Sequence, residues 1–507
     1  MTNFLYKYAI VIILLSVLPI QLSNAKRPLQ LDEAANAYQA YSILKTEKDV
    51  NGSKFPIGMS NYGVYDNIIL SYLAIPFIKT IGLNEIAIRM PPIIFYLLSI
   101  PLLCKLTKLI LNKQTALSAV LIYIFSPWTF KISQTAFNAN LLPFLYILAT
   151  YLFILGIKKQ KQKYLIISFA PWALTIYAFG SALLWTPFIL ILLTIIFFDQ
   201  IPNKKISLII LYLLIFLSAL PYLQNLTQHL LASNAIQDTT TRFQQISIFT
   251  NHQSITIPLA FAVNYLFHIS LVFFFIESTP PYLGLLNLYI LPLLCCGIWI
   301  CFKNRSEKIY KLLLIIFFAY PILPSLIDNV PTIHPTRDII ILPWIYIIAS
   351  IGLLTIWQKY LKTPKKQLLF TIVIILNIGF FLIVRRIYYK KVRGYQFQYS
   401  NKELVQYLKT IENKYDKIII RTDSSMADLF YYNLAFYLQY DPVNLQHDFD
   451  LHKYKKIGKY EWQKNPEKLE IKQNNLYIFN YRVIPKNNII KTIYNPDGKA
   501  AFSLMAL

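Results

Sequence analysis

The chain has 507 residues, of which 56% are hydrophobic and only 14% are charged, and its formal net charge is +25. Soluble globular proteins carry about 25% charged residues, so this composition excludes an ordinary soluble protein and indicates a polytopic membrane protein. The basic excess could suggest nucleic-acid binding. Most of the clustered lysines and arginines lie between apolar segments, where they set membrane topology, so no nucleic-acid partner is expected.

Eleven apolar segments are about long enough to cross the ~30 Å hydrocarbon core of a bilayer. These segments lie near residues 4–24, 88–108, 115–130, 140–157, 164–180, 182–199, 205–223, 283–302, 309–327, 338–358 and 367–385. Basic residues gather in alternate connections, and the positive-inside rule places those connections in the cytoplasm together with the N-terminus. The sequence therefore predicts a multi-pass protein of the inner (plasma) membrane, with the first loop, 25–87, and the C-terminal tail outside. Residues 1–25 could instead be a signal peptide.

The first outer loop begins with two adjacent acids, Asp32 and Glu33, in the stretch PLQLDEAANAYQAYSILKTEKD (28–49). These carboxylates could stabilise the start of a helix, since acidic residues favour its first turn. They could also act in proton transfer at the membrane surface. Both interpretations are compatible with the residues.

Two further apolar stretches, Asn67–Ile81 and Ile255–Ile276, do not fit as spans. The first is short and carries a lysine, and the second would place a basic cluster on the wrong side. We expect interfacial or re-entrant helices packed on the outer membrane surface.

The composition changes from about residue 387. Helical spacing is seen at 402–412 and 427–438, and short apolar strands are predicted at 417–421, 476–479 and 489–493. Helices alternating with strands predict a small α/β domain at 387–507, outside the membrane, after a transmembrane domain at 1–386.

Several motifs follow one another along the chain: LDEAANAYQAYSILKTEKDVNGSKFPI, YLAIPFIKTIGLNEIAIRMP, SPWTFKISQTAFNANL, IYAFGSALLWTP, TRFQQISIF and HPTRDIIILPW. In this order and with this topology, the chain resembles the bacterial polyprenyl-phosphate-sugar glycosyltransferases, membrane enzymes of the GT-C fold. They are similar to protein O-mannosyltransferases and the lipid A aminoarabinose transferase. The resemblance implies a GT-C-like fold for 1–386, with about 11 transmembrane helices plus interfacial helices.

The resemblance also implies an activity. A sugar would pass from a polyprenyl-phosphate donor in the membrane lipids to an acceptor lipid, polysaccharide or protein on the outer face. The catalytic base would be Asp32, with Glu33 beside it, because a carboxylate can take the proton of an attacking hydroxyl. The leaving lipid phosphate needs cations to stabilise its charge. The candidate cations are Arg89, Arg242, Arg337 and His334.

The arginines could instead anchor helix ends at the interface. No metal ion and no cofactor are expected, because the first outer loop offers no acidic ligand set beyond the acid pair. The run HDFDLH (447–452) has the look of a metal cluster, but it lies in the tail and is predicted to be a solvated loop.

The chain departs from its relatives at several charged positions. Relatives often read S-R-x-A-F-E-x-N-L where this chain reads SQTAFNANL (133–141), so Gln134 and Asn138 replace an arginine and a glutamate. An arginine is often expected where Leu183 stands, and a lysine where Asp66 stands. Asn138 could orient the acceptor, but an amide cannot take a proton at neutral pH.

These departures leave three functional alternatives. The donor or acceptor could differ from those of the relatives. The chain could be a non-catalytic lipid-sugar-binding or scaffolding member of the fold. An oligosaccharide ligase acting through Arg337 and His334 is the remaining enzymatic alternative.

Overall fold

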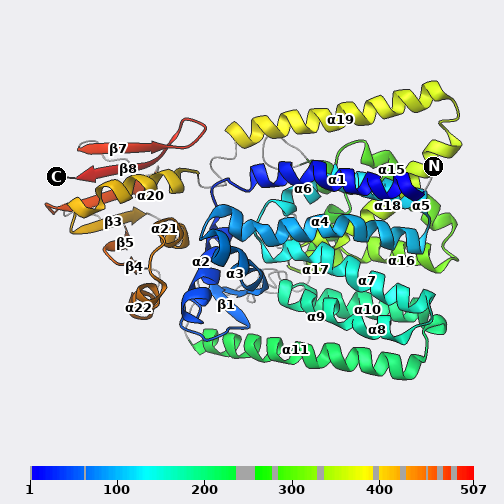
Figure 1. Cartoon of the computed structure of the whole chain (residues 1–507), viewed down its shortest axis with the longest axis horizontal. Helices are drawn as coiled ribbons and strands as arrows, with labels where there is room; N and C mark the ends of the chain where they lie inside the picture. The colour runs from blue at the N-terminus through cyan, green and yellow to red at the C-terminus, as the bar shows by residue number, and fades with distance from the viewer. Residues whose placement is uncertain are drawn as a thin grey trace. The chain divides into compact units, whose positions relative to one another are not determined.

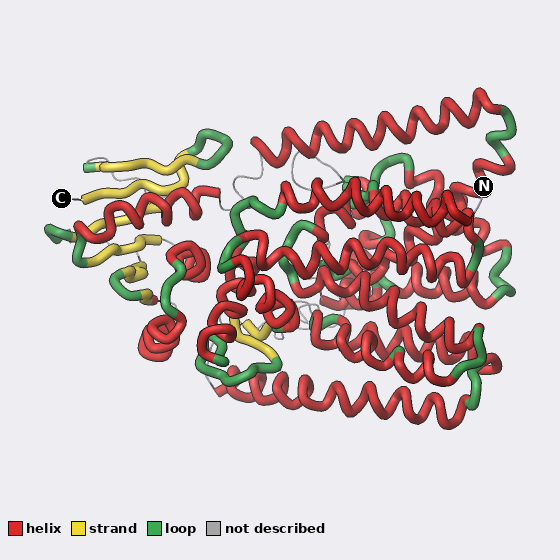
Figure 2. The backbone as a smooth tube through the Cα atoms, in the orientation of Figure 1, coloured by secondary structure: helices red, strands yellow, loops and turns green. Residues whose placement is uncertain are grey.

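The computed structural model describes residues 3–61, 64–235, 257–276, 284–327, 336–391, 399–422, 430–452, 455–464, 472–480 and 488–506. The chain forms two compact units. The first comprises Met1–Ser23, Tyr65–Ile69 and Pro92–Val384, and the second comprises Asn24–Val64, Leu70–Pro91 and Arg385–Leu507. The first unit is helical, and the second combines helices with a sheet (Figure 2).

The first unit is built from apolar helices, of which the longer ones run roughly parallel to one another (Figure 1). Its helical elements are α1 (Asn3–Asn24), α4 (Glu85–Ile110), α5 (Lys113–Ile124), α6 (Pro127–Ser133), η1 (Asn138–Leu141), α7 (Leu142–Lys158), α8 (Gln162–Ile167), α9 (Phe169–Ala178), α10 (Ala182–Phe197), η2 (Phe198–Gln200), α11 (Lys204–Ala235), α13 (Ile257–His268), α14 (Leu271–Phe275), α15 (Ile290–Lys303), α16 (Lys308–Ala319), α17 (Ile322–Ile327), η4 (Ile339–Ile341), α18 (Leu342–Lys359) and α19 (Pro364–Lys391). Within the described residues, six helices are long and apolar enough to cross a membrane, or seven if one bent pair forms a single span. The chain is therefore a helical membrane protein, and the count of eleven spans stays a prediction.

The bent pair falls within the predicted span at 115–130. α5 and α6 meet at an angle of 64° rather than forming one straight helix. Pro127 begins α6, a position where its missing N–H costs nothing. The hydroxyl of Tyr346 donates to Ser126 Oγ at 2.7 Å and so holds the buried break. A similar interruption separates α8 from α9 at Ser168, inside the span predicted at 164–180.

Two glycines let α15 and α18 approach each other closely. A Cβ atom on Gly352 would lie 1.8 Å from the carbonyl oxygen of Leu293, and one on Gly297 would lie 2.0 Å from that of Ile348. Only hydrogen atoms fit at these two points. Small residues bring membrane helices into dense backbone contact, which is a main source of their association.

The second unit contains a six-stranded sheet with the order β4-β5-β3-β6-β8-β7. Its strands are β3 (Lys417–Thr422), β4 (Lys456–Ile457), β5 (Tyr460–Lys464), β6 (Asn475–Asn480), β7 (Ile489–Tyr494) and β8 (Ala500–Ala506). The central strands β5, β3 and β6 are parallel, and the outer pairings are antiparallel. The predicted strands at 417–421, 476–479 and 489–493 are confirmed.

The second unit also contains helices and a short strand outside this sheet, and two of these elements come from residues 25–87. Its further elements are α2 (Leu31–Thr46), β1 (Gly58–Asn61), α20 (Tyr399–Ile411), η5 (Glu412–Lys414), α21 (Tyr431–Leu438) and α22 (Pro442–His452). The hydroxyl of Tyr38 in α2 donates to the carbonyl of Tyr440 at 2.6 Å, and Gln39 Nε2 donates to the hydroxyl of Tyr432 at 3.3 Å. These bonds join α2 to the end and the body of α21. The neighbouring elements β2 (Val64–Asn67) and α3 (Ile69–Ile81) complete the loop.

Candidate functional site

The two adjacent acids of the first outer loop lie in different environments. Both belong to the first turn of α2. Asp32 is exposed, whereas Glu33 is completely buried. The Glu33 carboxylate accepts the backbone N–H of Gln30 at 2.9 Å, which satisfies a donor at the helix start. Of the two predicted catalytic acids, only Asp32 therefore reaches the surface of its unit.

Glu33 is held by Arg89, another predicted site residue. Arg89 Nε donates to Glu33 Oε1 at 2.8 Å and Nη2 donates to Oε2 at 2.7 Å, in a fully buried bidentate pair. Nη1 donates to the carbonyls of Ala25 and Arg27 at 2.8 and 2.5 Å. Nη2 also donates to the carbonyl of Pro28 at 3.1 Å.

An arginine has five N–H donors, and all five of Arg89 are used in these bonds. The side chain fixes the segment 25–28, which leads directly into α2. The prediction that Arg89 binds the donor phosphate is not supported by this geometry, because no donor is left for a phosphate oxygen. We assign Glu33 and Arg89 a positioning role, which sequence reasoning missed because burial cannot be read from the two residues alone.

Another acid of residues 25–87, Asp49, is also buried. It accepts the backbone N–H of Ser53 at 2.8 Å. Burial raises the pKa of Asp49 to about 6, although hydrogen bonds from Ser53 and Asn51 oppose the shift. Asp49 is thus a titratable group of the second unit, and the sequence analysis did not single it out.

Asn138 lies in the first unit, within η1, and is buried. Its Nδ2 donates to the carbonyl of Asn67 at 2.7 Å. Asn67 in turn donates to the carbonyls of Ile176 and Tyr177 at 3.2 and 3.0 Å. The two amides together link η1, Asn67 and the end of α9, and the predicted contact of Asn138 with an acceptor stays a prediction.

The other departures from the relatives have varied surroundings. Gln134 is buried, and Leu183 is half-buried in the first turn of α10. The Asp66 carboxylate accepts the backbone N–H of Asn67 at 2.8 Å, and its side chain is half-buried.

Arg337 is half-buried and immediately precedes a buried acid, Asp338. His268 Nδ1 lies 3.3 Å from Asp338 Oδ1, and both side chains are fully buried. The hydroxyl of Tyr320 donates to the carbonyl of His268. Sequence reasoning missed this His–Asp pair, because 70 positions separate its members. The other two predicted phosphate ligands, Arg242 and His334, lie outside the described residues.

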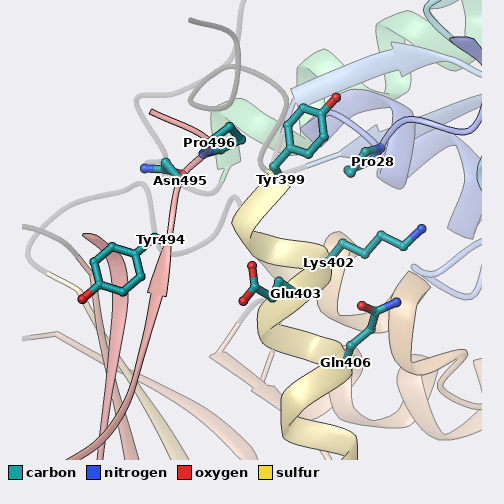
Figure 3. Close-up of a pocket in the computed structure, with 8 residues that line it drawn as sticks. All are labelled: Pro28, Tyr399, Lys402, Glu403, Gln406, Tyr494, Asn495 and Pro496. Carbon is teal, nitrogen blue, oxygen red and sulfur yellow. The ribbon is translucent and has the colours of Figure 1, made fainter. Parts of the chain in front are cut away.

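A cavity of about 380 Å³ opens in the second unit beside the start of α20 (Figure 3). Its lining includes Pro28, Lys402, Glu403 and Asn495. Lys402 Nζ lies 2.6 Å from Glu85 Oε1, so the cation of this cavity already has a carboxylate partner. The cavity therefore offers little uncompensated positive charge to a ligand.

Among the residues described, no group of three or more His, Cys, Asp or Glu side chains could hold a metal ion. Asp448, from the acidic run in the tail, accepts the N–H of Gly458 at 2.7 Å and the hydroxyl of Tyr440 at 3.1 Å. The run 447–452 lies in α22, so the prediction of a solvated loop there is wrong.

A family model matches part of the chain, and solved structures share its fold. A family model described as dolichyl-phosphate-mannose-protein mannosyltransferase matches residues 68–226. ArnT from Cupriavidus metallidurans, in the apo state, superposes with a TM-score of 0.54 at 10% identity over 97% of each chain. The chain resembles the polyprenyl-phosphate-sugar glycosyltransferases of the GT-C fold.

Two further structures share this GT-C fold. ArnT bound to undecaprenyl phosphate superposes with a TM-score of 0.54 at 11% identity, again over 97% of each chain. The oligosaccharyltransferase AglB from Archaeoglobus fulgidus, in complex with an inhibitory peptide and a dolichol-phosphate, gives a TM-score of 0.54 at 11% identity over 92% of this chain and 69% of AglB. The chain spans only 63% of the Archaeoglobus fulgidus oligosaccharyltransferase tethered with an acceptor peptide. No curated protein matches the chain by sequence.

Proposed function

We propose that the chain is a glycosyltransferase that moves a sugar from a polyprenyl-phosphate donor to an acceptor of the cell envelope, which is a lipid, a polysaccharide or a protein. The observation that carries the proposal is the contrast within the acid pair. Asp32 is exposed, while the buried Glu33–Arg89 pair fixes the segment before it. The likeness to ArnT, of which one structure contains undecaprenyl phosphate, adds support.

Asp32 would act as the general base. It would accept the proton of the acceptor hydroxyl while that oxygen forms a bond to the anomeric carbon. The bond from the anomeric carbon to the phosphate oxygen would break, and the lipid phosphate would leave with the electron pair. A single displacement of this kind needs one base and inverts the anomeric centre. The N-terminal end of α2 favours the charged form of Asp32, because the helix dipole stabilises an anion there.

The leaving lipid phosphate carries negative charge, and cationic side chains would stabilise it. Arg337 is the described candidate, half-buried just before η4. Arg242 and His334 remain candidates from their positions in the sequence. A guanidinium suits this role, since it can bind two phosphate oxygens at once.

The membrane arrangement belongs to the same proposal. Eleven spans with a cytoplasmic N-terminus would place the first outer loop and residues 387–507 on the outer face of the inner (plasma) membrane. The charge bias between alternate connections supports this orientation. The lipid-linked donor would then stay in the bilayer while its sugar reaches the outer surface.

The experiment is donor turnover by the purified full-length protein. The protein is reconstituted in liposomes with polyprenyl-phosphate-linked sugars extracted from the host membrane, together with host envelope material as acceptor. Mass spectrometry then measures free polyprenyl phosphate and new glycosidic products. The proposal predicts release that depends on the protein and on the acceptor fraction. Absence of release from every lipid-linked sugar of the host would overturn it.

A second candidate function has a specific observation in its favour. Gln134 and Asn138 are uncharged, and the Asn138 amide donates to backbone rather than standing free for a substrate. A non-catalytic member of the fold would bind the lipid-linked sugar without releasing the lipid phosphate. Co-purified polyprenyl-phosphate sugar that survives prolonged incubation with acceptor would identify this alternative.

A further inference from the structure

The central strand of the sheet in the second unit has two different faces. Ile420 pairs with Trp462 of β5, and the Trp462 ring lies 5.6 Å from the ring of Tyr431 in α21. This face therefore packs on a helix. Side chains alternate along a strand, so the next residue, Arg421, belongs to the opposite face.

Arg421 is buried on that face without an obvious structural reason. Arg421 is only 3% exposed. The guanidinium carbon lies 5.6 Å from the centre of the Tyr477 ring. In the described part of the chain, neither Nε nor Nη1 has a hydrogen-bond acceptor. Burying an arginine without an acceptor is unfavourable, so such a group usually bonds to water, to an ion or to a ligand.

The Arg421 side chain lines a cavity of about 670 Å³, a size typical of small-molecule sites. Lys417 and Glu461 also line this cavity and form an ion pair at 2.9 Å, so their charges offset each other. Lys472 supplies a second cation at the wall. Asp416 also lines the cavity, so the lining carries three cations and two carboxylates and keeps a net charge of +1 for an anion.

The remaining walls carry groups that suit a sugar. Three amide side chains, Gln463, Gln473 and Asn475, line the cavity and can both donate to and accept from hydroxyl groups. The Tyr477 ring supports one side of the Arg421 guanidinium, which leaves the guanidinium edge for a planar contact with an anion.

We propose that this cavity binds an anionic sugar. Its carboxylate or phosphate group pairs with Arg421 and Lys472, and its hydroxyls bond to the amides. A charged group on a guanidinium forms short, charge-assisted hydrogen bonds, which give both affinity and orientation. Binding does not depend on the glycosyl-transfer activity. The further idea that the bound sugar belongs to the acceptor rests on the proposed function.

The cavity beside α20 shows why charge availability decides the choice. Its one lysine, Lys402, is already paired with Glu85 at 2.6 Å, and Glu403 adds a negative charge to the wall (Figure 3). An anion would have to displace a carboxylate there. Asp416 adds a negative charge to the wall of the cavity at Arg421 as well, but there Nε and Nη1 of the guanidinium have no acceptor in the described part of the chain.

The test is isothermal titration calorimetry of the purified full-length protein. It measures the affinity for three probes: galacturonic acid, galactose 6-phosphate and galactose. At least one of the two anionic sugars should bind about tenfold or more tightly than galactose, since a hydrogen bond to a charged group is worth roughly that factor. A preference for the first identifies a carboxylate ligand, and a preference for the second identifies a phosphate ligand. The proposal is overturned if neither anionic sugar binds more tightly than galactose.

Two variants and a control separate a ligand role from a structural one. Arg421→Met should weaken binding of the preferred sugar about tenfold or more, while its thermal midpoint stays equal or rises, because a buried charge is removed. Lys472→Met changes an exposed side chain and should also weaken binding, so folding of the first variant does not decide the outcome. Lys409→Met, at an exposed site on α20 outside the cavity, should bind like the parent.

Equal affinity of the parent and both cavity variants would overturn the proposal. A protein that releases polyprenyl phosphate yet binds no anionic sugar keeps the proposed function and loses this site. A protein that binds the anionic sugar but releases no polyprenyl phosphate keeps this site and loses the proposed function.

Discussion

Variants of the buried pair Glu33–Arg89 test whether these two residues position the start of α2. Glu33→Gln removes the negative charge and leaves the cation of Arg89 buried, with both groups fully excluded from solvent in the parent. Breaking a buried pair from one side typically costs about 3–5 kcal/mol, because the remaining charge is uncompensated. The double variant Glu33→Leu/Arg89→Met removes both charges and should recover part of that loss.

The recovery should be incomplete. The five hydrogen bonds of Arg89 include three to the carbonyls of Ala25, Arg27 and Pro28, and methionine replaces none of them. Each lost bond costs about 1 kcal/mol. The segment 25–28 should therefore exchange its amide hydrogens faster in both variants than in the parent.

Thermal unfolding of the purified protein and hydrogen exchange at 25–33 measure these effects. Glu47→Gln is the matched control, since it removes an exposed carboxylate from the other end of α2. A Glu33→Gln variant with the thermal midpoint and exchange rates of the parent would refute the positioning role. A double variant no better than Glu33→Gln would refute the part of the argument that concerns the uncompensated charge.

Two other predictions rest on the structure, and a third rests on the charge bias of the sequence. Gly352→Ala should destabilise the protein by about 1–3 kcal/mol and so lower its thermal midpoint, because its Cβ would lie 1.8 Å from the Leu293 carbonyl oxygen. Gly379→Ala in α19, with no atom within 4 Å of its Cβ, should not lower the midpoint, and equal midpoints of the two variants would contradict this. Burial raises the pKa of Asp49 to about 6, so the stabilising contribution of its protonated form is complete below about pH 4 and is lost as the pH rises through about 6. Asp49→Asn should thus stabilise the protein by about 3 kcal/mol near neutral pH and by less than about 1 kcal/mol near pH 4 in denaturant titrations, and a gain independent of pH would show the reasoning to be wrong. An alkaline phosphatase fused after Leu507 should be active, and an inactive fusion beside a fluorescent cytoplasmic one would overturn the proposed orientation.

The helical membrane architecture could be predicted because apolar length and charge alternation are local properties of the sequence. The same holds for the strands at 417–421 and 476–479, which are short apolar runs between polar turns. The strand β8 (Ala500–Ala506) was missed, because AAFSLMA contains no β-branched residue. Its pairing with β6 and β7 overrides its weak intrinsic preference.

The site was harder to predict, because its distinctions depend on contacts between distant positions. Asp32 and Glu33 are adjacent and chemically alike, and only the location of Arg89, 56 positions away, separates an exposed acid from a buried one. The close approach at Gly297 and Gly352 is equally non-local. Glycine inside an apolar helix is not a sufficient signal either, because Gly379 in α19 has no atom within 4 Å of its Cβ position.

The central claim is that Asp32 takes the acceptor proton. The most direct test is the single-turnover rate of polyprenyl phosphate release from the lipid-linked donor by Asp32→Asn, with Glu47→Gln as the control on the same helix. General-base catalysis contributes about 10²–10⁴-fold, so Asp32→Asn should be slower by roughly that factor, with unchanged donor binding. A variant that releases the lipid phosphate at the rate of the parent would contradict the account and leave Asp32 as a helix-capping residue.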